Sequence, residues 1–283
     1  MIENFDQDDF VRRLLAEDLG EGGDVTSRVT IGEDARFTAT MNCREGITVA
    51  GIEIAAAFFR VLDGEVVLDV AVSDGDSVEA GTVLMRIEGR AQAMLTAERS
   101  ALNTLQHLSG IATLTRRYVD AIAGTGAVLL DTRKTIPGLR ALGKYAARMG
   151  GAHNHRMRLD DGILIKDNHV GVCGGVAQAV RAAKGADTGL QVQVEVDRIE
   201  QIAPALEAGA DRLLLDNMGP ATLREAVALV AGRVPLEASG GINLETIRGI
   251  AETGVDFISV GRITQSAPAV DIGLDYVLTP SGR

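Results

Sequence analysis

The sequence predicts an α/β fold in two parts, and three observations support this. First, six short apolar runs alternate with helical patterns over residues 127–261, which is typical of parallel strands joined by crossover helices. Second, residues 35–90 carry short alternating runs with Asp-Gly and Ala-Gly turns, which indicates a separate and partly open β layer. Third, the stretch "VLLDTRKT" (residues 128–135) ends an apolar run with two adjacent cations, which suggests a bound anion.

The first part is predicted to contain three helices besides its strands. Residues 5–19 form an amphipathic pattern that "GEGGDVTS" ends, and residues 51–62 form a second helical pattern inside the β layer. A long helix is predicted over residues 91–122. Its apolar side chains recur at steps of three or four residues, namely Ala97, Ala101, Leu105, Leu108 and Ala112. Residues 270–278 alternate again, so we expect them to return to the first part as a strand.

The second part is predicted to be a barrel or a doubly wound sheet. Its six strands are expected at residues 127–131, 162–167, 191–197, 212–217, 235–240 and 257–261, with helices between most of them at 173–186, 198–209, 220–232 and 244–254. Every run ends in a polar, charged or glycine residue. In a barrel these ends meet at the C-terminal face, where loops build active sites, whereas an open sheet would gather them less tightly.

Composition favours a soluble metabolic protein of the cytoplasm. The formal net charge of −11 argues against nonspecific nucleic-acid binding and against docking on anionic lipid. The apolar stretch 47–62 is interrupted by Glu53 and Arg60, so no membrane span is expected, and the acidic N-terminus is unlike a secretory signal. The two cysteines, Cys43 and Cys173, form no disulfide framework or zinc pattern, which indicates a reducing compartment.

One segment reverses the charge of the chain. Between residues 131 and 166 there are eight cations, Arg133, Lys134, Arg140, Lys144, Arg148, Arg156, Arg158 and Lys166, against the three anions Asp131, Asp160 and Asp161. Such a basic pocket suits a small polyanion, because Arg binds carboxylates and phosphates bidentately and Lys provides a point charge. We expect the cations at strand ends to belong to the pocket. Those at positions 140, 144 and 148 have the four-residue spacing of one exposed helix face.

His153 and His155 alternate in "GAHNHRM". On an extended segment, residues two apart point the same way, so both are expected to face one site. A metal site is one interpretation, but no third ligand lies nearby and Arg156 would repel a divalent ion. Anion binding or hydrogen bonding is favoured, and a hydrogen-bonded core position is left open for one of the two.

Two further groups of residues lie at predicted strand ends. Glu195 and Asp216 are either paired with nearby lysines or bind Mg²⁺, ribose hydroxyls or a developing cation. The "EASGGI" turn and the "SVGRIT" corner bring glycines to the starts of helices, where backbone N–H groups bind phosphate, although an ordinary tight turn explains either one alone.

With these segments in view, the sequence resembles the quinolinate phosphoribosyltransferases. The matching stretches run in order over nearly the whole chain and include "AEDLGEGGDVTS", "ERSALNTLQHLSGIATLT", "DTRKTIPGLRALGKYA", "GGAHNHRMRLDDGILIKDNH", "EAGADRLLLDNM" and "LEASGGINLETI". The resemblance implies an N-terminal open α/β sandwich (residues 1–112, joined by 270–283) and an incomplete α/β barrel (113–269). It implies transfer of phosphoribose from phosphoribosyl pyrophosphate to quinolinate with decarboxylation, in NAD biosynthesis.

The resemblance also implies roles for individual residues. The carboxylates of quinolinate would meet Arg99, Arg133, His155, Arg156 and Lys166, with Arg99 reaching across the interface of a homodimer. Phosphoribosyl pyrophosphate and its Mg²⁺ would face Lys134, Lys166, Glu195 and Asp216, and the 5-phosphate would lie against Ser239, Gly240, Gly241 and Gly261. Lys134, Lys166, Glu195 and Asp216 are the expected catalytic residues, and Glu195 and Asp216 would hold the metal directly or indirectly. Assemblies beyond a dimer stay open.

The chain departs from the family pattern at three positions, and three alternatives compete with this function. Arg262 stands where a small residue is common, Gln265 where His is usual and Arg158 where Gly is usual. The alternatives are a molybdenum-associated paralogue of the same fold, a Schiff-base aldolase using Lys166, and a noncatalytic anion sensor. The "HNHRM" and "IKDNH" segments favour the quinolinate enzyme over the paralogue.

Overall fold

The computed structural model describes residues 2 and 5–277, and within them the chain divides into two compact units. Unit 1 comprises residues 1–114, 141–150 and 266–283, and unit 2 comprises residues 115–140 and 151–265. The domain bounds expected from the sequence remain a prediction, because contacts within a unit do not show that the unit folds alone. Positions 278–283 of the expected C-terminal return lie outside the described residues.

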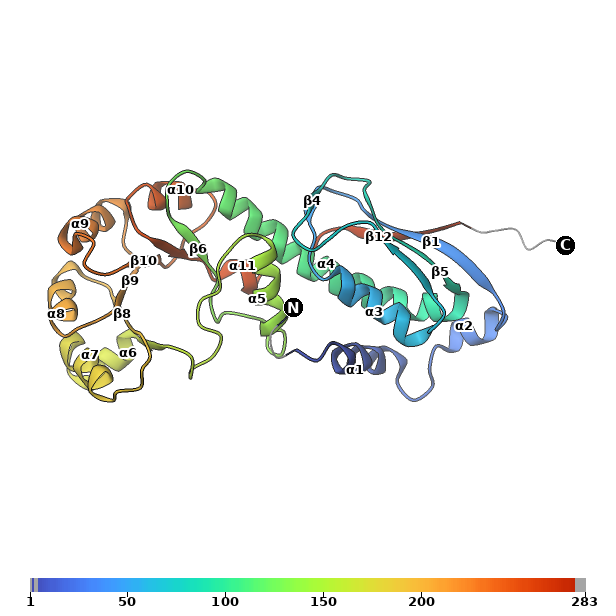
Figure 1. The fold of residues 1–283 in the computed structure, drawn as a ribbon, viewed down its shortest axis with the longest axis horizontal. Coiled ribbons are helices and arrows are strands. Elements are labelled where there is room, and N and C mark those ends of the chain that lie inside the picture. Colours follow the sequence, from blue (N-terminus) through green and yellow to red (C-terminus); the bar gives the residue numbers. More distant parts are fainter. Residues whose placement is uncertain (1, 3–4, 278–283) are drawn as a thin grey trace. The chain divides into compact units, whose positions relative to one another are not determined.

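Unit 1 is built on an antiparallel sheet of four strands in the order β12-β1-β5-β3. The strands are β1 (Arg36–Cys43), β3 (Val67–Val70), β5 (Val83–Arg90) and β12 (Ile272–Val277), and a small second sheet pairs β2 (Ile47–Thr48) with β4 (Ser77–Val78). The helices are α1 (Gln7–Leu19), α2 (Val25–Thr30), α3 (Ile52–Leu62) and α5 (Arg140–Met149), together with most of α4 (Ala91–Ala121). Helices α3 and α4 cover one face of the four-stranded sheet (Figure 1).

The predicted apolar face of α4 is confirmed, because Ala97, Ala101, Leu105, Leu108 and Ala112 are all buried. Polar side chains on the same helix hold the neighbouring loop. Ser109 Oγ accepts a hydrogen bond from the backbone N–H of Ala50 at 3.1 Å, and Thr113 Oγ1 accepts one from Thr48 at 2.8 Å. Small residues and short hydroxyls therefore let the backbone of the β2–α3 segment approach α4 closely.

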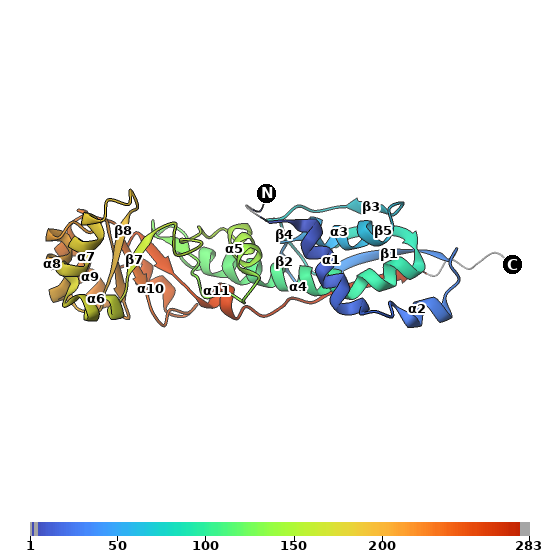
Figure 2. The ribbon, with the colours of Figure 1, turned by 90° about the horizontal axis from the view of Figure 1, so that it is seen from below.

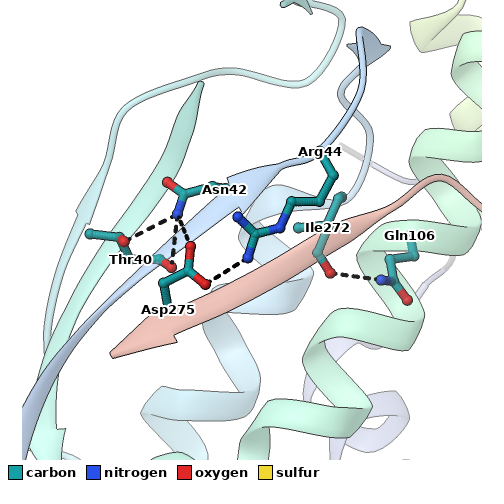
Figure 3. Close-up of polar contacts among 6 residues, drawn as sticks. All are labelled: Thr40, Asn42, Arg44, Gln106, Ile272 and Asp275. Carbon is teal, nitrogen blue, oxygen red and sulfur yellow. Dashed lines mark hydrogen bonds and ion pairs between the residues drawn. The ribbon is translucent and has the colours of Figure 1, made fainter. Parts of the chain in front are cut away.

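The expected return of the chain to the first part is also confirmed by β12, which pairs antiparallel with β1 (Figure 3). Asp275 accepts hydrogen bonds from Asn42 Nδ2 at 2.8 Å and from Arg44 Nη2 at 2.6 Å, and Gln106 Nε2 donates to the carbonyl of Ile272 at 2.7 Å. The last strand is thus fixed to both β1 and α4.

Unit 2 is an incomplete barrel of six parallel strands in the order β6-β11-β10-β9-β8-β7. Each strand lies inside a run expected from the sequence: β6 (Val128–Leu130), β7 (Ile163–Ile165), β8 (Val192–Val196), β9 (Arg212–Asp216), β10 (Leu236–Ser239) and β11 (Phe257–Ser259). Since no pairing of β6 with β7 is found among the described strands, the barrel is open there. Strands β7 to β11 lie side by side in chain order, without the reversal of direction that marks a doubly wound sheet, so the barrel is the correct alternative.

Helices lie outside this curved sheet (Figures 1 and 2). They are α6 (Asp167–Cys173), α7 (Val176–Gly185), the 3-10 turn η1 (Ile199–Gln201), α8 (Ile202–Glu207), α9 (Pro220–Val230), α10 (Ile247–Ala251) and α11 (Arg262–Gln265). Val180, Ile202, Leu223 and Ile247 of these helices are fully buried. None of the helices in the described part of the chain is long and apolar enough to cross a membrane.

Candidate active site

A cavity of about 850 Å³ lies at the C-terminal ends of the barrel strands, within unit 2. Alternation along each strand decides which residues line it: Glu195 follows Gln193 on the inner face of β8, Asp216 follows Leu214 on β9, and Ser239 follows Glu237 on β10. The expectation that the strand ends meet at one face is confirmed.

The cavity brings together most of the residues that the sequence predicted for a site. Those that line it are Arg133, Lys134, His155, Arg156, Lys166, Glu195, Asp216, Ser239, Gly240, Gly241 and Gly261. Arg99 does not line it, since this residue is exposed on the part of α4 that belongs to unit 1. Placement in the cavity does not test the roles of these residues, which stay predictions.

One wall of the cavity carries the clustered cations. Arg133 Nε is buried and has no hydrogen-bond partner among the described residues, and Arg156 Nη1 donates to the carbonyl of Gly162 at 2.9 Å. Burial lowers the pKa of the Arg156 guanidinium, and the charge of Arg133 lowers it further. Two guanidinium groups held close together repel one another, and a bound anion would relieve that repulsion. This wall is therefore suited to binding an anion.

Lys166 and Glu195 lie at the ends of the neighbouring strands β7 and β8, with Lys166 Nζ 3.6 Å from Glu195 Oε2. Burial raises the pKa of the Glu195 carboxyl, Lys166 opposes that rise, and the nearby carboxylates of Asp216 and Asp167 add to it. The side chain of Lys166 is half exposed to solvent, whereas that of Glu195 is largely covered. The pair therefore combines an accessible cation with a shielded carboxylate.

Asp216 completes a pair of carboxylates on adjacent strands, and its Oδ2 accepts a hydrogen bond from Asn217 Nδ2 at 2.6 Å. No group of three or more His, Cys, Asp or Glu side chains that could hold a metal by themselves is found among residues 2 and 5–277. Two carboxylates in one cavity nevertheless fit Mg²⁺, since this ion is commonly bound by one or two carboxylates together with substrate phosphates and water.

The other end of the cavity is formed by glycines in conformations that side chains disfavour. Gly240 and Gly241 have φ angles of 97° and 63°, and a Cβ atom on Gly240 would collide with the side-chain amide of Asn217. A Cβ on Gly261 would lie 2.7 Å from Lys134 Cδ. Bare backbone is therefore required at the 240–241 turn, as a phosphate site needs, whereas at Gly261 the flexible Lys134 side chain could move aside. Arg262 and Gln265 line the same end.

Two expectations about individual side chains were wrong. Lys144, expected on an exposed helix face, is fully buried, because the face of α5 that carries it also carries the buried Ala147. His153 does not line the cavity with His155 and is exposed. Its backbone forms an isolated bridge with Leu130, and residues 154–156 do not continue it as a strand, so the alternation of an extended segment does not apply.

Sequence reasoning missed a polar layer at the floor of the cavity, which Glu237 helps to line. Glu237 is fully buried, and its Oε2 accepts hydrogen bonds from Gln193 Nε2 at 2.8 Å and lies 2.7 Å from Arg212 Nη2. The buried carboxylate of Asp131 accepts from the backbone N–H of His155 at 2.8 Å. The alternation of side chains along a strand could have predicted this layer. Gln193 and Glu237 precede Glu195 and Ser239 by two positions, so they face the same side of the sheet.

Comparison with family models matches both parts of the chain. Residues 24–109 match the model of the quinolinate phosphoribosyl transferase N-terminal domain, and residues 111–275 match the model of the C-terminal domain of the same family. The two matches together cover almost all of the chain.

Relatives and solved structures agree with these matches. The chain is 44% identical to the nicotinate-nucleotide pyrophosphorylase (carboxylating) of Mycobacterium leprae, over 94% of this chain and 96% of that protein. The solved nicotinate-nucleotide pyrophosphorylase from Francisella tularensis superposes with a TM-score of 0.92 at 41% identity, covering 98% and 99% of the two chains. The enzyme of that name from Ehrlichia chaffeensis gives 0.93 at 38% identity, covering 97% and 100%. The chain therefore belongs to the quinolinate phosphoribosyl transferase family.

Proposed function

We propose that this protein transfers the phosphoribosyl group of phosphoribosyl pyrophosphate to quinolinate and releases CO₂ and pyrophosphate, giving nicotinate mononucleotide. The observation that carries the proposal is the cavity itself. A wall of cations, a pair of carboxylates and a glycine turn line one space of about 850 Å³, and each group suits one portion of the two substrates. Family membership supports the same activity.

Quinolinate is proposed to bind at the cationic wall. Its two adjacent carboxylates are matched by Arg133, Arg156 and Lys166, and charge-assisted hydrogen bonds to carboxylates are the strong ones. The buried Nε of Arg133 supports this, because a buried donor without a partner is costly in the free protein and a ligand carboxylate would satisfy it. The cations would thereby fix N1 of the pyridine ring in front of the sugar.

Phosphoribosyl pyrophosphate is proposed to extend from the carboxylates to the glycine turn. Ser239, Gly240, Gly241 and Gly261 would hold the 5-phosphate through backbone N–H groups, and Glu195 and Asp216 would face the ribose. The same two carboxylates would hold Mg²⁺, directly or through water. When bound with pyrophosphate, Mg²⁺ supplies charge neutralisation of the leaving group.

The chemistry is proposed to proceed in two steps. The bond between C1 of ribose and pyrophosphate breaks with its electron pair leaving on pyrophosphate, and the lone pair of N1 forms the new bond to C1. Lys134 would stabilise the leaving charge, and Glu195 or Asp216 would stabilise positive charge on the sugar. The bond from C2 to the carboxylate then breaks, CO₂ leaves, and the electron pair left at C2 takes a proton from water. Lys134 or Lys166 would stabilise that electron density.

The structure offers no support for the aldolase alternative. An apolar wall would favour a Schiff-base lysine, yet Lys166 Nζ lies 3.6 Å from Glu195 Oε2 in a cavity that Arg133 and Asp167 also line. The anion-sensor alternative has no need for the pair Glu195 and Asp216, which line the cavity.

We further propose a homodimer in which Arg99 completes the partner's cavity, and a cytoplasmic location. Arg99 is exposed on α4, so its guanidinium is available to another copy of the chain. Both cysteines are free thiols, which suits a reducing compartment. Sedimentation analysis and localisation of a fluorescently tagged chain test these two statements.

The activity is tested by incubating the purified protein with quinolinate, phosphoribosyl pyrophosphate and Mg²⁺ and measuring nicotinate mononucleotide and CO₂. Nicotinate is the matched control substrate, because it lacks the carboxylate at C2. Turnover of quinolinate that stops when a chelator removes Mg²⁺ is expected. Turnover of nicotinate instead, or of neither acid, would refute the proposal.

A further inference from the structure

The interior of the barrel contains charged and polar side chains where other barrels have apolar ones. Interior layers of such barrels are filled mainly by Val, Ile and Leu, and an unpaired buried charge is costly. Here Gln193, Arg212 and Glu237 point inward from three adjacent strands, β8, β9 and β10. These residues lie one layer below the predicted substrate-binding residues of the same strands. Because burying polar and charged side chains is unfavourable, a function in the neighbouring site would account for their presence.

Glu237 is the centre of this layer. Its Oε2 accepts a hydrogen bond from Gln193 Nε2 at 2.8 Å and forms an ion pair with Arg212, whose Nη2 lies 2.7 Å away. The Arg212 guanidinium lies over the ring of Phe257, 3.9 Å from its centroid. Burial by itself would raise the pKa of the Glu237 carboxyl, but His155, Arg212 and Ser259 outweigh burial and lower it. The residue is therefore a buried carboxylate with its charge retained.

The same oxygen faces the imidazole of His155, whose Nε2 lies 3.5 Å from Glu237 Oε2. On the other side of the ring, Nδ1 accepts a hydrogen bond from the backbone N–H of Arg156 at 2.7 Å. An acceptor nitrogen carries no proton, so the proton of the neutral ring lies on Nε2, toward the carboxylate. The imidazole therefore lies between the Glu237 carboxylate and the backbone N–H of Arg156, whose guanidinium belongs to the cavity wall.

We propose that Glu237 is a positioning residue that keeps His155 in its Nε2-protonated form, so that Nδ1 fixes the backbone of Arg156 and thereby its guanidinium at the cavity wall. Arg212 and Gln193 hold the carboxylate in place, and Arg212 also balances its charge. Glu237 itself would act on the substrate only through His155 and Arg156. The proposal is separate from the reaction, although its kinetic test rests on the function proposed above.

The proton position is tested by nitrogen NMR of the protein labelled with ¹⁵N-histidine, comparing the parent with Glu237→Gln. Long-range spectra distinguish a protonated Nε2 from a protonated Nδ1, and a His155→Gln variant assigns the signals. We expect the parent to show His155 protonated on Nε2 and the Glu237→Gln variant to lose this preference, while His107, His153 and His169 keep their signals. Unchanged His155 signals would overturn the proposal, whatever the activity of the protein.

The kinetic arm separates positioning from general damage to the fold. Loss of a charge-assisted contact is expected to raise KM for quinolinate about tenfold, while KM for phosphoribosyl pyrophosphate changes less than about twofold. Glu252→Gln, which breaks the exposed pair with Arg248 on α10, is the matched control and should change neither value. An equal rise in both KM values would contradict positioning. If the parent turns over no quinolinate, the proposed function fails and the NMR result still decides the role of Glu237.

A second variant covers the case in which Glu237→Gln does not fold because Arg212 is left as a buried cation. The double variant Glu237→Gln/Arg212→Leu removes both charges, and buried pairs replaced by neutral residues are often tolerated. It is expected to show the same loss of the Nε2 proton preference and the same selective rise in KM for quinolinate. Parental values for both measurements would overturn the proposal.

Discussion

Lys166 Nζ lies 3.6 Å from Glu195 Oε2, across the ends of two neighbouring parallel strands. Burial raises the pKa of the Glu195 carboxyl, and the Lys166 ammonium opposes that rise. Glu195 must be ionised to hold a cation, and Lys166 therefore supports that state besides any direct contact with substrate.

Replacing Lys166 with Met should move the titration of Glu195 to higher pH. Without the ammonium, burial and the Asp216 carboxylate act unopposed, so the Glu195 carboxyl should bind its proton more tightly. Carbon NMR of the protein labelled at Glu carboxyl carbons, in metal-free buffer, measures the midpoint, and Glu195→Gln assigns the signal. Lys184→Met, which breaks an ion pair with Asp211 outside the cavity, is the control. An unchanged midpoint would show that the pair is not coupled.

Arg133→Ala should weaken the binding of quinolinate selectively. A charge-assisted hydrogen bond contributes about 1.5–3 kcal/mol, so KM for quinolinate should rise by roughly ten- to a hundredfold, with kcat/KM falling accordingly. Steady-state kinetics with each substrate varied in turn measure this. Arg158→Ala removes an exposed Arg that is paired with Asp160 and lies outside the cavity, and it should leave KM close to parental. Equal effects of the two variants on KM would contradict the proposed binding of a quinolinate carboxylate by Arg133.

The strands and most of the site could be predicted from the sequence because their signals are local. Each apolar run ends in a turn or charged residue, and parallel strands bring such ends together whatever the details of packing. Arg133, Lys166 and Ser239 therefore meet in one cavity as expected. The glycine turn at 240–241 is equally local, since positive φ angles favour Gly whatever packs around the turn.

What failed depends on contacts between distant segments. The spacing of Arg140, Lys144 and Arg148 defines a face of α5 but cannot say whether that face meets solvent or protein, and Lys144 is buried. Alternation predicted that His153 and His155 share a side. The backbone N–H of His155 donates to the Asp131 carboxylate while the backbone of His153 pairs with Leu130, and no strand continues from one residue to the other.

Gly240→Ala should damage both stability and phosphate binding. Its φ of 97° is strained for any side chain, and the added methyl group would collide with the Asn217 side chain, so we expect a loss of about 1–3 kcal/mol in the free energy of unfolding and a higher KM for phosphoribosyl pyrophosphate. Gly249→Ala on α10 is the control, because a Cβ there meets open space and Ala favours helix. Urea denaturation measures the free energy of unfolding, and steady-state kinetics measure KM. Parental values for Gly240→Ala would contradict the requirement for glycine in this turn.

Asp63→Asn should destabilise the protein at neutral pH and reduce its sensitivity to acid. The Asp63 carboxylate, 2% exposed, accepts from the N–H of Arg90 at 2.8 Å, which holds its pKa below the usual 3.8. A depressed carboxyl pKa contributes stability above 3.8 that is lost as the pH falls through the folded value. We expect a loss of about 1–3 kcal/mol at pH 7 that shrinks toward pH 3, measured by urea denaturation. Asp69→Asn, exposed beside Arg86, should have little effect. A pH-independent loss would contradict this assignment.

Mixing two inactive variants tests whether Arg99 serves a neighbouring copy of the chain. Arg99→Ala and Lys166→Ala should each be inactive, since each variant of the proposed homodimer lacks one component in both cavities. In a heterodimer both changes fall in one cavity if Arg99 acts across the interface, so the other cavity is intact and about half of parental turnover returns. Heterodimers isolated through two affinity tags provide the measurement. Lys166→Ala mixed with Glu195→Gln is the matched control, because these residues lie in the same cavity and neither copy is intact. Recovery in the control, or none in the Arg99 pair, would place Arg99 outside the shared site.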